Sequence, residues 1–226
     1  MRDESHPSRN RRTGSENKTS SGVSMGDEIA VSRDPVARWA ERQDWIRPEV
    51  EQTAQGAIHS AFELLGPAGD GVRSFLQGEW LHEPLHAAIT DVPVGAWAAT
   101  VTLDSMAAMY PGTGIDRAAD ATLWLGLLGA LAAAATGMAD WAYIDQPRPR
   151  RVGAVHALLN IGATALFTAS ALVRKRNRNN GRALAGIGFA VVFLSAHLGG
   201  NLVYEHKIGM DRGSATRQPE EGGTGI

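Results

Sequence analysis

The sequence predicts an all-α integral membrane protein, in which a four-helix transmembrane bundle follows a disordered tail and an amphipathic helical segment. Residues 152–173 and 183–204 contain no Asp, Glu, Lys or Arg, and each stretch is long enough to cross a hydrocarbon core of roughly 30 Å. Two further apolar stretches, 87–109 and 121–139, precede them. The connections between the four stretches are short, so sequential neighbours should run antiparallel in a compact bundle.

The composition restricts the chemistry of this chain of 226 residues. Its net charge of -2 argues against a nucleic-acid-binding protein, which is normally strongly basic over its binding domain. Because the chain has no cysteine, disulfides, thiolate zinc sites and cysteine-ligated iron–sulfur clusters are excluded. A metal ion or haem would have to be held by His, Met, carboxylate or amide groups. Residues 1–25 are charged and lack an apolar core, so no signal peptide is expected there.

The first third of the chain divides into a tail and a helical segment. Residues 1–33 are rich in Ser, Arg, Asn and Gly and are predicted to be disordered, because they offer too little apolar surface for a core. In residues 34–77, Asp34-Pro35 is typical of a helix start and Gly66-Pro67 of a helix end. An apolar stripe recurs there at intervals near three or four residues: Val36, Trp39, Ile46, Val50, Ala54, Ala57, Ala61 and Leu64.

This stripe has two interpretations. The favoured one is a helical hairpin packed on the protein's own surface, because the polar face carries both signs of charge. The other is a helix that lies in the membrane interface, for which a polar face rich in lysine and arginine is typical.

Residues 78–207 are predicted to form the transmembrane domain, and residues 208–226 a second disordered tail. Gly and Ala dominate all four spans, which permits close approach of the helices. The sequence shows no convincing internal repeat. Aromatic residues flank the spans, as is typical of membrane interfaces: Trp80, Tyr110, Trp124, Trp141, Tyr143 and Tyr204.

The first span, 87–109, differs from the others because it carries Asp91 and Asp104. A carboxylate inside the membrane costs about 3 kcal/mol by insertion scales unless it faces a partner or water. We expect Asp104 to pair with Arg117 or with an arginine of residues 174–182, in a structural role.

Alternating helix directions bring the starts of the first and third spans and the ends of the second and fourth to one membrane face. Histidines and carboxylates gather at that face: His82, Glu83, His86, Asp91, Asp140, His156 and His197. Residues four apart share a helix face, so His156 presents its side chain in the same direction as Asn160, and His197 in the same direction as Asn201. The sequence therefore predicts one polar cluster at a single depth.

This cluster has a functional and a structural interpretation. Imidazole suits haem iron, zinc, copper and non-haem iron, and it can relay protons. The candidate cofactor ligands are His86, His156 and His197, with His82 and Glu83 secondary. The candidate metal ligands are the same three histidines with Asp91 and Asp140. Alternatively, these side chains only hydrogen-bond between helices, the role we expect for Asn160 and Asn201.

Four strings carry a resemblance to a known family: FLQGEWLHEPLHAAITDVPVGAW, TGMADW, RRVGAVHALLN and HLGGNLVYEHKIGMD. In order and spacing, over residues 74–212, they resemble the DUF2231 family of predicted bacterial membrane proteins. The resemblance implies four transmembrane helices in the inner (plasma) membrane of a bacterium. Some members resemble fusions to Rieske-type ferredoxin domains, which suggests electron transfer.

The resemblance also bears on the candidate ligands. His86 and His156 match histidines of the family. Where the family pattern is HPLHP, this chain has EPLHA, so Glu83 stands at the first histidine position with His82 directly before it. Where the pattern is GGHLVY, this chain has Asn201, and His197 lies one turn earlier.

Two functions of different classes follow. The first is a membrane redox protein that holds a b-type haem or a metal ion through its clustered histidines and passes electrons to a partner protein. The second is a non-catalytic membrane subunit or scaffold, whose N-terminal helices dock a soluble partner. A proton or ion pathway is third, because it needs polar groups through the full bilayer. No catalytic residue is assigned, and enzymatic activity and homo-oligomerisation are left open.

Overall fold

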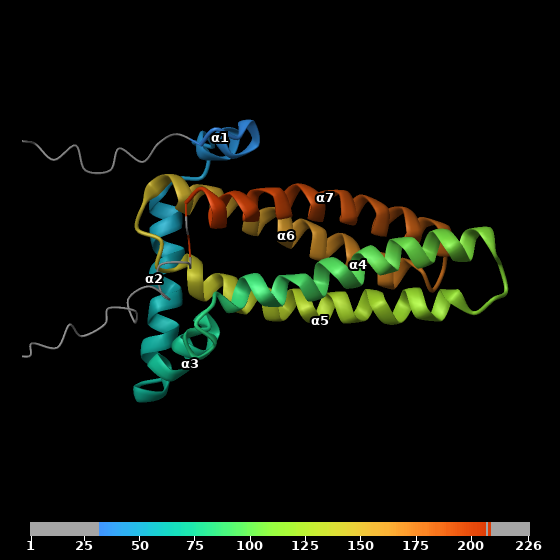
Figure 1. Ribbon diagram of the computed structural model, residues 1–226, viewed down its shortest axis with the longest axis horizontal. Coiled ribbons are helices and arrows are strands. Elements are labelled where there is room, and N and C mark those ends of the chain that lie inside the picture. The colour runs from blue at the N-terminus through green and yellow to red at the C-terminus, as the bar shows by residue number, and fades with distance from the viewer. Residues whose placement is uncertain (1–31, 207, 209–226) are drawn as a thin grey trace, which may run out of the picture. The chain divides into compact units, whose positions relative to one another are not determined.

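The computed structural model describes residues 32–206 and 208, and this part of the chain is helical without any strand (Figure 1). The predicted disordered tails, 1–33 and 208–226, lie outside the described residues except at positions 32, 33 and 208. The elements in chain order are α1 (Pro35–Glu41), α2 (Pro48–Leu64), α3 (Pro67–Gln77), the 3-10 turn η1 (Glu79–Leu81), α4 (Leu85–Met109), α5 (Ile115–Trp141), α6 (Pro147–Val173) and α7 (Arg178–Tyr204).

The four long helices, α4 to α7, lie side by side as two antiparallel hairpins (Figure 1). The helices within each hairpin, α4 with α5 and α6 with α7, are in much closer contact than the hairpins are with one another. The helices α5, α6 and α7 are long and apolar enough to cross a membrane. The all-α prediction is therefore confirmed for the described residues, and the prediction of membrane spans is confirmed as three candidate spans.

The two hairpins repeat one another in position. The same number of residues separates Trp97 of α4 from Phe167 of α6, and His86 of α4 from His156 of α6. A second separation in sequence relates equivalent positions of α5 and α7, such as Gly126 and Gly188. A Cβ on Gly126 would collide with the Trp97 ring, and one on Gly188 would press on Phe167. A pseudo-twofold axis along the bundle therefore relates the hairpins.

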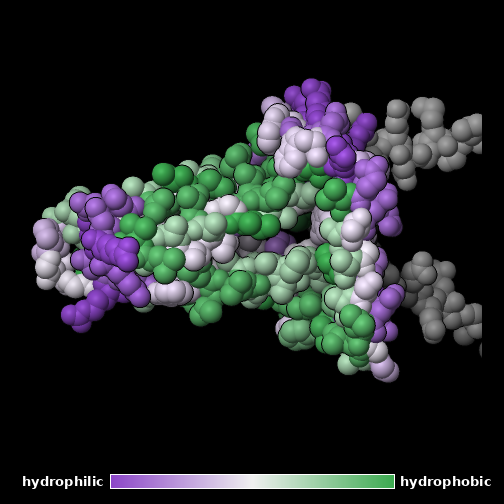
Figure 2. All heavy atoms as spheres, turned by 180° about the vertical axis from the view of Figure 1, so that it is seen from behind, coloured by the Kyte–Doolittle hydropathy of each residue, from purple (hydrophilic) through white to green (hydrophobic). Residues whose placement is uncertain are grey.

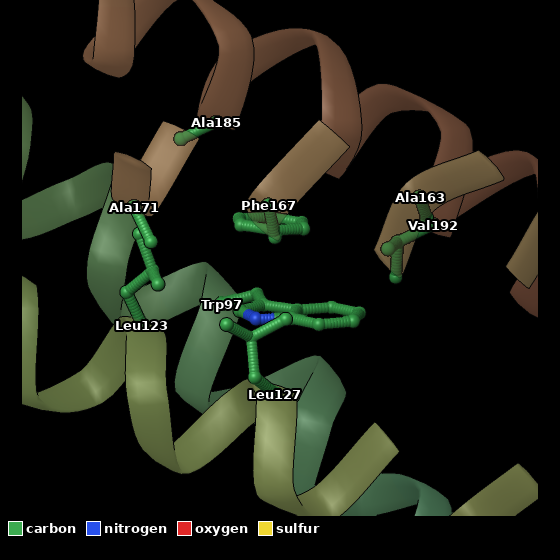
Figure 3. Close-up of a cluster of buried hydrophobic side chains, with 8 residues drawn as sticks. All are labelled: Trp97, Leu123, Leu127, Ala163, Phe167, Ala171, Ala185 and Val192. Atoms are coloured by element: carbon green, nitrogen blue, oxygen red, sulfur yellow. The ribbon is translucent and has the colours of Figure 1, made fainter. Parts of the chain in front are cut away.

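The core of the bundle lies where this axis passes between Trp97 and Phe167. Their rings stack with centroids 4.1 Å apart and an interplanar angle of 5° (Figure 3). Such a stacked aromatic pair is worth about 1 kcal/mol beyond the apolar area that it buries. Small and branched side chains of the helices α5, α6 and α7 complete the cluster: Leu123, Leu127, Ala163, Ala171, Ala185 and Val192.

An ion-pair network joins the hairpins at the end of the bundle that carries the 110–114 and 174–177 connections. Arg174 pairs with the buried Asp104, as expected for an arginine of residues 174–182, and with Asp120 at 3.1 Å. Arg178 and Arg182 bind Asp116 at 2.6 and 2.9 Å. This end is strongly hydrophilic, and the visible side of the bundle between the ends is mostly hydrophobic (Figure 2).

The helices α1 to α3 pack at the opposite end, and α2 crosses it (Figure 1). Glu51 of α2 forms a buried ion pair of 3.3 Å with Arg150 of α6. Gln55 donates to the carbonyl of the last residue of α5 and to that of Ile144 in the α5–α6 connection. Gln77 of α3 donates to the Ala139 carbonyl of α5 at 3.0 Å. The N-terminal helical segment thus packs on the protein's own surface, as the favoured interpretation expected, but α2 and α3 do so through polar side chains.

The apolar stripe contacts the bundle only in its first part. Ile46 and the small residues of α1 are buried against α6 and α7. Along α2, however, the stripe is exposed, with Val50 at 61% and Leu64 at 87%. The expectation that the stripe forms the packing face is therefore wrong for α2, because Glu51 and Gln55 on another face make the contacts.

Candidate functional site

His86, in the first turn of α4, is fixed by the neighbouring helix α5. Its Nδ1 lies 2.9 Å from the Ala133 carbonyl oxygen and 3.3 Å from the Thr136 hydroxyl. A carbonyl oxygen can only accept, so Nδ1 carries the proton and donates it. The ring rests on Gly137, where a Cβ would come within 2.8 Å of it.

His156 repeats this arrangement in the second hairpin. Its Nδ1 donates to the Ser195 carbonyl oxygen of α7 at 2.8 Å, and its ring rests on Gly199. Asn160, one turn further along α6, donates its amide N–H to Nε2 at 3.0 Å. The spacings that relate the hairpins also connect Ala133 with Ser195 and Gly137 with Gly199. The two histidines are therefore equivalent in position and in anchoring.

The two imidazoles meet between the hairpins. Their centroids lie 6.2 Å apart with an interplanar angle of 87°, so one ring presents its edge to the face of the other. They come from α4 and α6, which lie diagonally opposite in the bundle. A recess opens between the hairpins toward the end of the bundle that carries α2 (Figure 2). We call His86 and His156 the histidine pair.

His197 does not join the histidine pair. Ser195, Leu198 and Gly199 occupy the inward face of α7, so the ring of His197 points outward and is about half exposed. Its Nε2 lies 2.6 Å from Asp34 Oδ2, the residue that caps α1. The backbone N–H of Ala37, together with those contacts, holds the pKa of Asp34 below its usual value.

The remaining candidate ligands differ in their surroundings. His82 and Glu83 are exposed in the turn before α4, and His82 adopts a left-handed backbone with φ 59°. Asp91 is exposed on α4, whereas Asp140 is buried at the end of α5. Among the described residues, no group of three or more His, Asp or Glu side chains is arranged to hold a metal ion. The structure thus brings together two of the predicted ligands.

A second polar cluster, which the sequence did not predict, ties the start of α1 to the end of α7. The buried Ser32 donates its hydroxyl to Glu205 at 2.5 Å and accepts a bond of 3.1 Å from Asn201. This contact keeps the pKa of Glu205 below its usual value. His206 lies 3.8 Å from Glu41. The capping signal at Asp34-Pro35 was the only sequence feature that pointed to order here.

Comparison with known proteins places this geometry in a family. The model of DUF2231, described as a predicted membrane protein, matches residues 82–212. The match contains the helices α4 to α7 and both members of the histidine pair, whereas α1 to α3 precede it. No curated protein and no solved structure matches the chain.

Proposed function

The chain belongs to the DUF2231 family of predicted membrane proteins, and from that premise we propose that its histidine pair holds a redox cofactor, either a b-type haem or a transition-metal ion. We further propose a multi-pass protein of the bacterial cytoplasmic membrane that passes electrons to a partner protein. The observation that carries this proposal is the matched anchoring of two imidazoles at equivalent positions of two hairpins.

The anchoring of both rings supports a role as metal or haem ligands. A ligating imidazole almost always donates its second N–H to a carbonyl or carboxylate, which fixes the tautomer and the ring orientation. Both Nδ1 atoms donate to a backbone carbonyl, which leaves Nε2 as the ligating atom. Within the described residues, Nε2 of His86 makes no hydrogen bond, and Nε2 of His156 accepts only from Asn160, which a ligand would displace.

The histidine pair would supply two ligands to a haem iron or a metal ion, and not a complete coordination sphere. Histidine is a usual axial ligand of haem iron, and cofactors of helical bundles are held by side chains of facing helices. When bound, such a group would supply one-electron transfer. The protein's part is to fix the two rings through Ala133 and Ser195 and to surround them with apolar helices that lower the local dielectric.

We also propose that α4 is a fourth membrane span. Its 25 residues can cross the bilayer. The buried Asp104 is neutralised by Arg174, which offsets the cost of that carboxylate inside the membrane. A fourth span places the histidine pair within the transmembrane domain, at the depth of the first turn of α4 and the third turn of α6.

A second function is favoured by a different property of the same pair. Three of its four ring nitrogens already have hydrogen-bond partners inside the protein, as in polar residues that only hold membrane helices together. The protein would then be a non-catalytic membrane subunit or scaffold. In that case the histidine pair contributes to stability alone.

An absorption spectrum and metal analysis of detergent-purified protein distinguish the two functions, with added haemin or metal ions to fill sites left empty during expression. We expect a Soret band or a stoichiometric metal content that His86→Ala and His156→Ala each abolish. His197→Ala is the matched control, because this ring lies outside the pair, and it should retain the signal. Colourless, metal-free protein that stays so after the additions, and loses only stability in the variants, would support the scaffold.

A further inference from the structure

The helix α3 and the turn after it expose large apolar side chains that no other part of the described chain covers. Val72 and Leu81 are each 40% exposed, Trp80 56% and Phe75 58%. We call these four residues the α3 patch. Polar residues occupy other faces of α3: Gln77 is buried against α5, and Asp70 points to solvent in an ion pair with Arg73. The helix is therefore amphipathic, with its apolar face unpartnered.

The contacts of α3 fix its depth along the bundle. Gln77 donates to the Ala139 carbonyl, and the Arg73 guanidinium lies 5.4 Å from the centre of the Tyr143 ring. The first contact is at the last turn of α5, where this candidate span ends, and the second lies two residues beyond that end. Trp80 lies just before the start of α4. The α3 patch is thus level with the boundary of the membrane rather than with the water beyond it.

The surface around the α3 patch has the polarity of a membrane boundary. In the region of α2 and α3, hydrophobic residues gather on the side that faces along the bundle, whereas hydrophilic residues lie on the far side (Figure 2). Met138, next to Ala139 on α5, is half exposed. Aromatic side chains at this end, Trp80, Tyr143 and Tyr204, are exposed as well. Trp and Tyr concentrate at this depth in membrane proteins.

We propose that α3 lies in the interface of the bilayer and inserts the α3 patch among the lipid acyl chains beside the bundle. The patch lies at the same depth as the end of the exposed apolar surface of α5, which faces lipid if α5 spans the membrane. Trp80 suits this position, because its indole N–H donates to the Phe75 carbonyl at 3.2 Å and its ring stacks on the Phe75 ring. No polar atom of the indole is left unsatisfied in lipid. This proposal is independent of any cofactor at the histidine pair.

The absence of cysteine allows a direct test, because one introduced cysteine is the only site for a thiol-reactive dye. Val72→Cys places an NBD fluorophore in the α3 patch, and Asp70→Cys places it on the polar face of the same helix. Both side chains are exposed, so neither variant should disturb folding. The labelled full-length proteins are reconstituted in phosphatidylcholine–phosphatidylglycerol vesicles that contain lipids with a nitroxide at a shallow or a deep acyl position. Leu128→Cys, exposed at the middle of α5, is the deep reference.

We expect the shallow nitroxide to quench the Val72→Cys label several-fold more than the Asp70→Cys label and more than the deep nitroxide does. The Leu128→Cys label should show the opposite depth preference. If the Val72→Cys label is quenched no more than the Asp70→Cys label and is open to aqueous iodide, the α3 patch faces water and the proposal is wrong. That result would leave the patch as a docking surface for a soluble protein.

Discussion

Two glycines determine where the histidine pair can lie. The ring of His86 rests on Gly137 and that of His156 on Gly199, so each imidazole occupies the space that a side chain would fill. Close approach of this kind needs a residue without a Cβ. The glycines therefore act as the floor of the site, and the carbonyls one turn earlier, at Ala133 and Ser195, set the rotation of the rings.

Gly137→Ala should displace the His86 ring and break its hydrogen bond to Ala133. The added Cβ would lie 2.8 Å from the ring, and overpacking of this kind costs about 1–3 kcal/mol. Thermal unfolding in detergent measures the loss. Gly162→Ala is the control, because nothing lies within 4 Å of its Cβ and alanine favours a helix by about 0.5–1 kcal/mol. Equal melting temperatures of the two variants would contradict the packing.

The sequence predicted which residue types gather at one end of the bundle, but not which of them face one another. His86, His156 and His197 share a depth because helix direction alternates, and that follows from the order of the spans. Whether a side chain points to the axis depends on the rotation of its helix about its own axis. Apolar residues surround all faces of these spans, so the pattern carries no record of that rotation. His197 was therefore grouped with a pair from which it points away.

Among the elements, α1 depends most on a single carboxylate. Asp34 accepts hydrogen bonds from the backbone N–H groups of Val36 and Ala37 and binds His197 of α7. It thus caps the helix and attaches it to the bundle at once. The pKa of Asp34 is lowered in the folded protein, so its ionised form stabilises α1.

The docking of α1 should consequently be lost only in strong acid. A depressed pKa gives stability that is complete above the unfolded value of 3.8 and is lost as the pH falls through the lower folded value. Hydrogen exchange, corrected for intrinsic rates, should report protected α1 amides at neutral pH and exchange well below 3.8. Asp34→Ala should weaken the protection at neutral pH by about 1 kcal/mol, the usual loss of an N-cap.

The exposed ion pair of Asp70 with Arg73 supplies the control for this experiment. Asp70→Ala removes a carboxylate that is more exposed than Asp34 and caps nothing on α1, and it should leave the exchange of α1 unchanged. Protection of α1 in Asp34→Ala equal to that of the unmutated chain would show that apolar contacts, such as those of Ala37 and Ala40, hold the helix alone.

The helices themselves were predictable, whereas the contacts of α2 were not. Long charge-free stretches admit few alternatives to a membrane helix, and Pro or Gly mark most helix ends. Periodicity indicates which residues share a face, but not what that face contacts. On α2 the buried position is Glu51, because Arg150 of α6 lies opposite to it. An ion pair across distant parts of the chain leaves no local signal in either segment.

At the scale of the whole molecule, the number of spans decides on which side of the membrane each connection lies. With four spans, Ser60 of α2 and Asp145 of the α5–α6 connection lie on one side, and Thr113 of the α4–α5 connection lies on the other. If α4 does not cross, Ser60 lies on the side of Thr113. We expect single cysteines at Ser60 and Asp145 to react with an impermeant maleimide from the same side in intact cells or inverted vesicles, and one at Thr113 from the opposite side.

The positional repeat of the two hairpins was missed in the sequence because it is not a repeat of residue types. Equivalent positions hold Trp97 and Phe167, or Asp104 and Arg174, so alignment of one half with the other finds little identity. The equivalence emerges only when contacts are compared, because each aromatic ring and each imidazole rests on a glycine of its own hairpin. The two hairpins thus place their side chains at equivalent positions, although the residue types at those positions differ.

The ion pairs at the far end of the bundle have a consequence for how the chain assembles. The separations in sequence that relate the hairpins pair Asp104 of α4 with Arg174. They also pair Asp116 and Asp120 of α5 with Arg178 and Arg182 of α7. At these three positions the first hairpin is acidic and the second is basic. Two copies of the first would set carboxylate against carboxylate, and two copies of the second would oppose guanidinium groups. The charges therefore favour pairing of the first hairpin with the second hairpin of the same chain, which is synthesised after it. They disfavour the association of two copies of either hairpin.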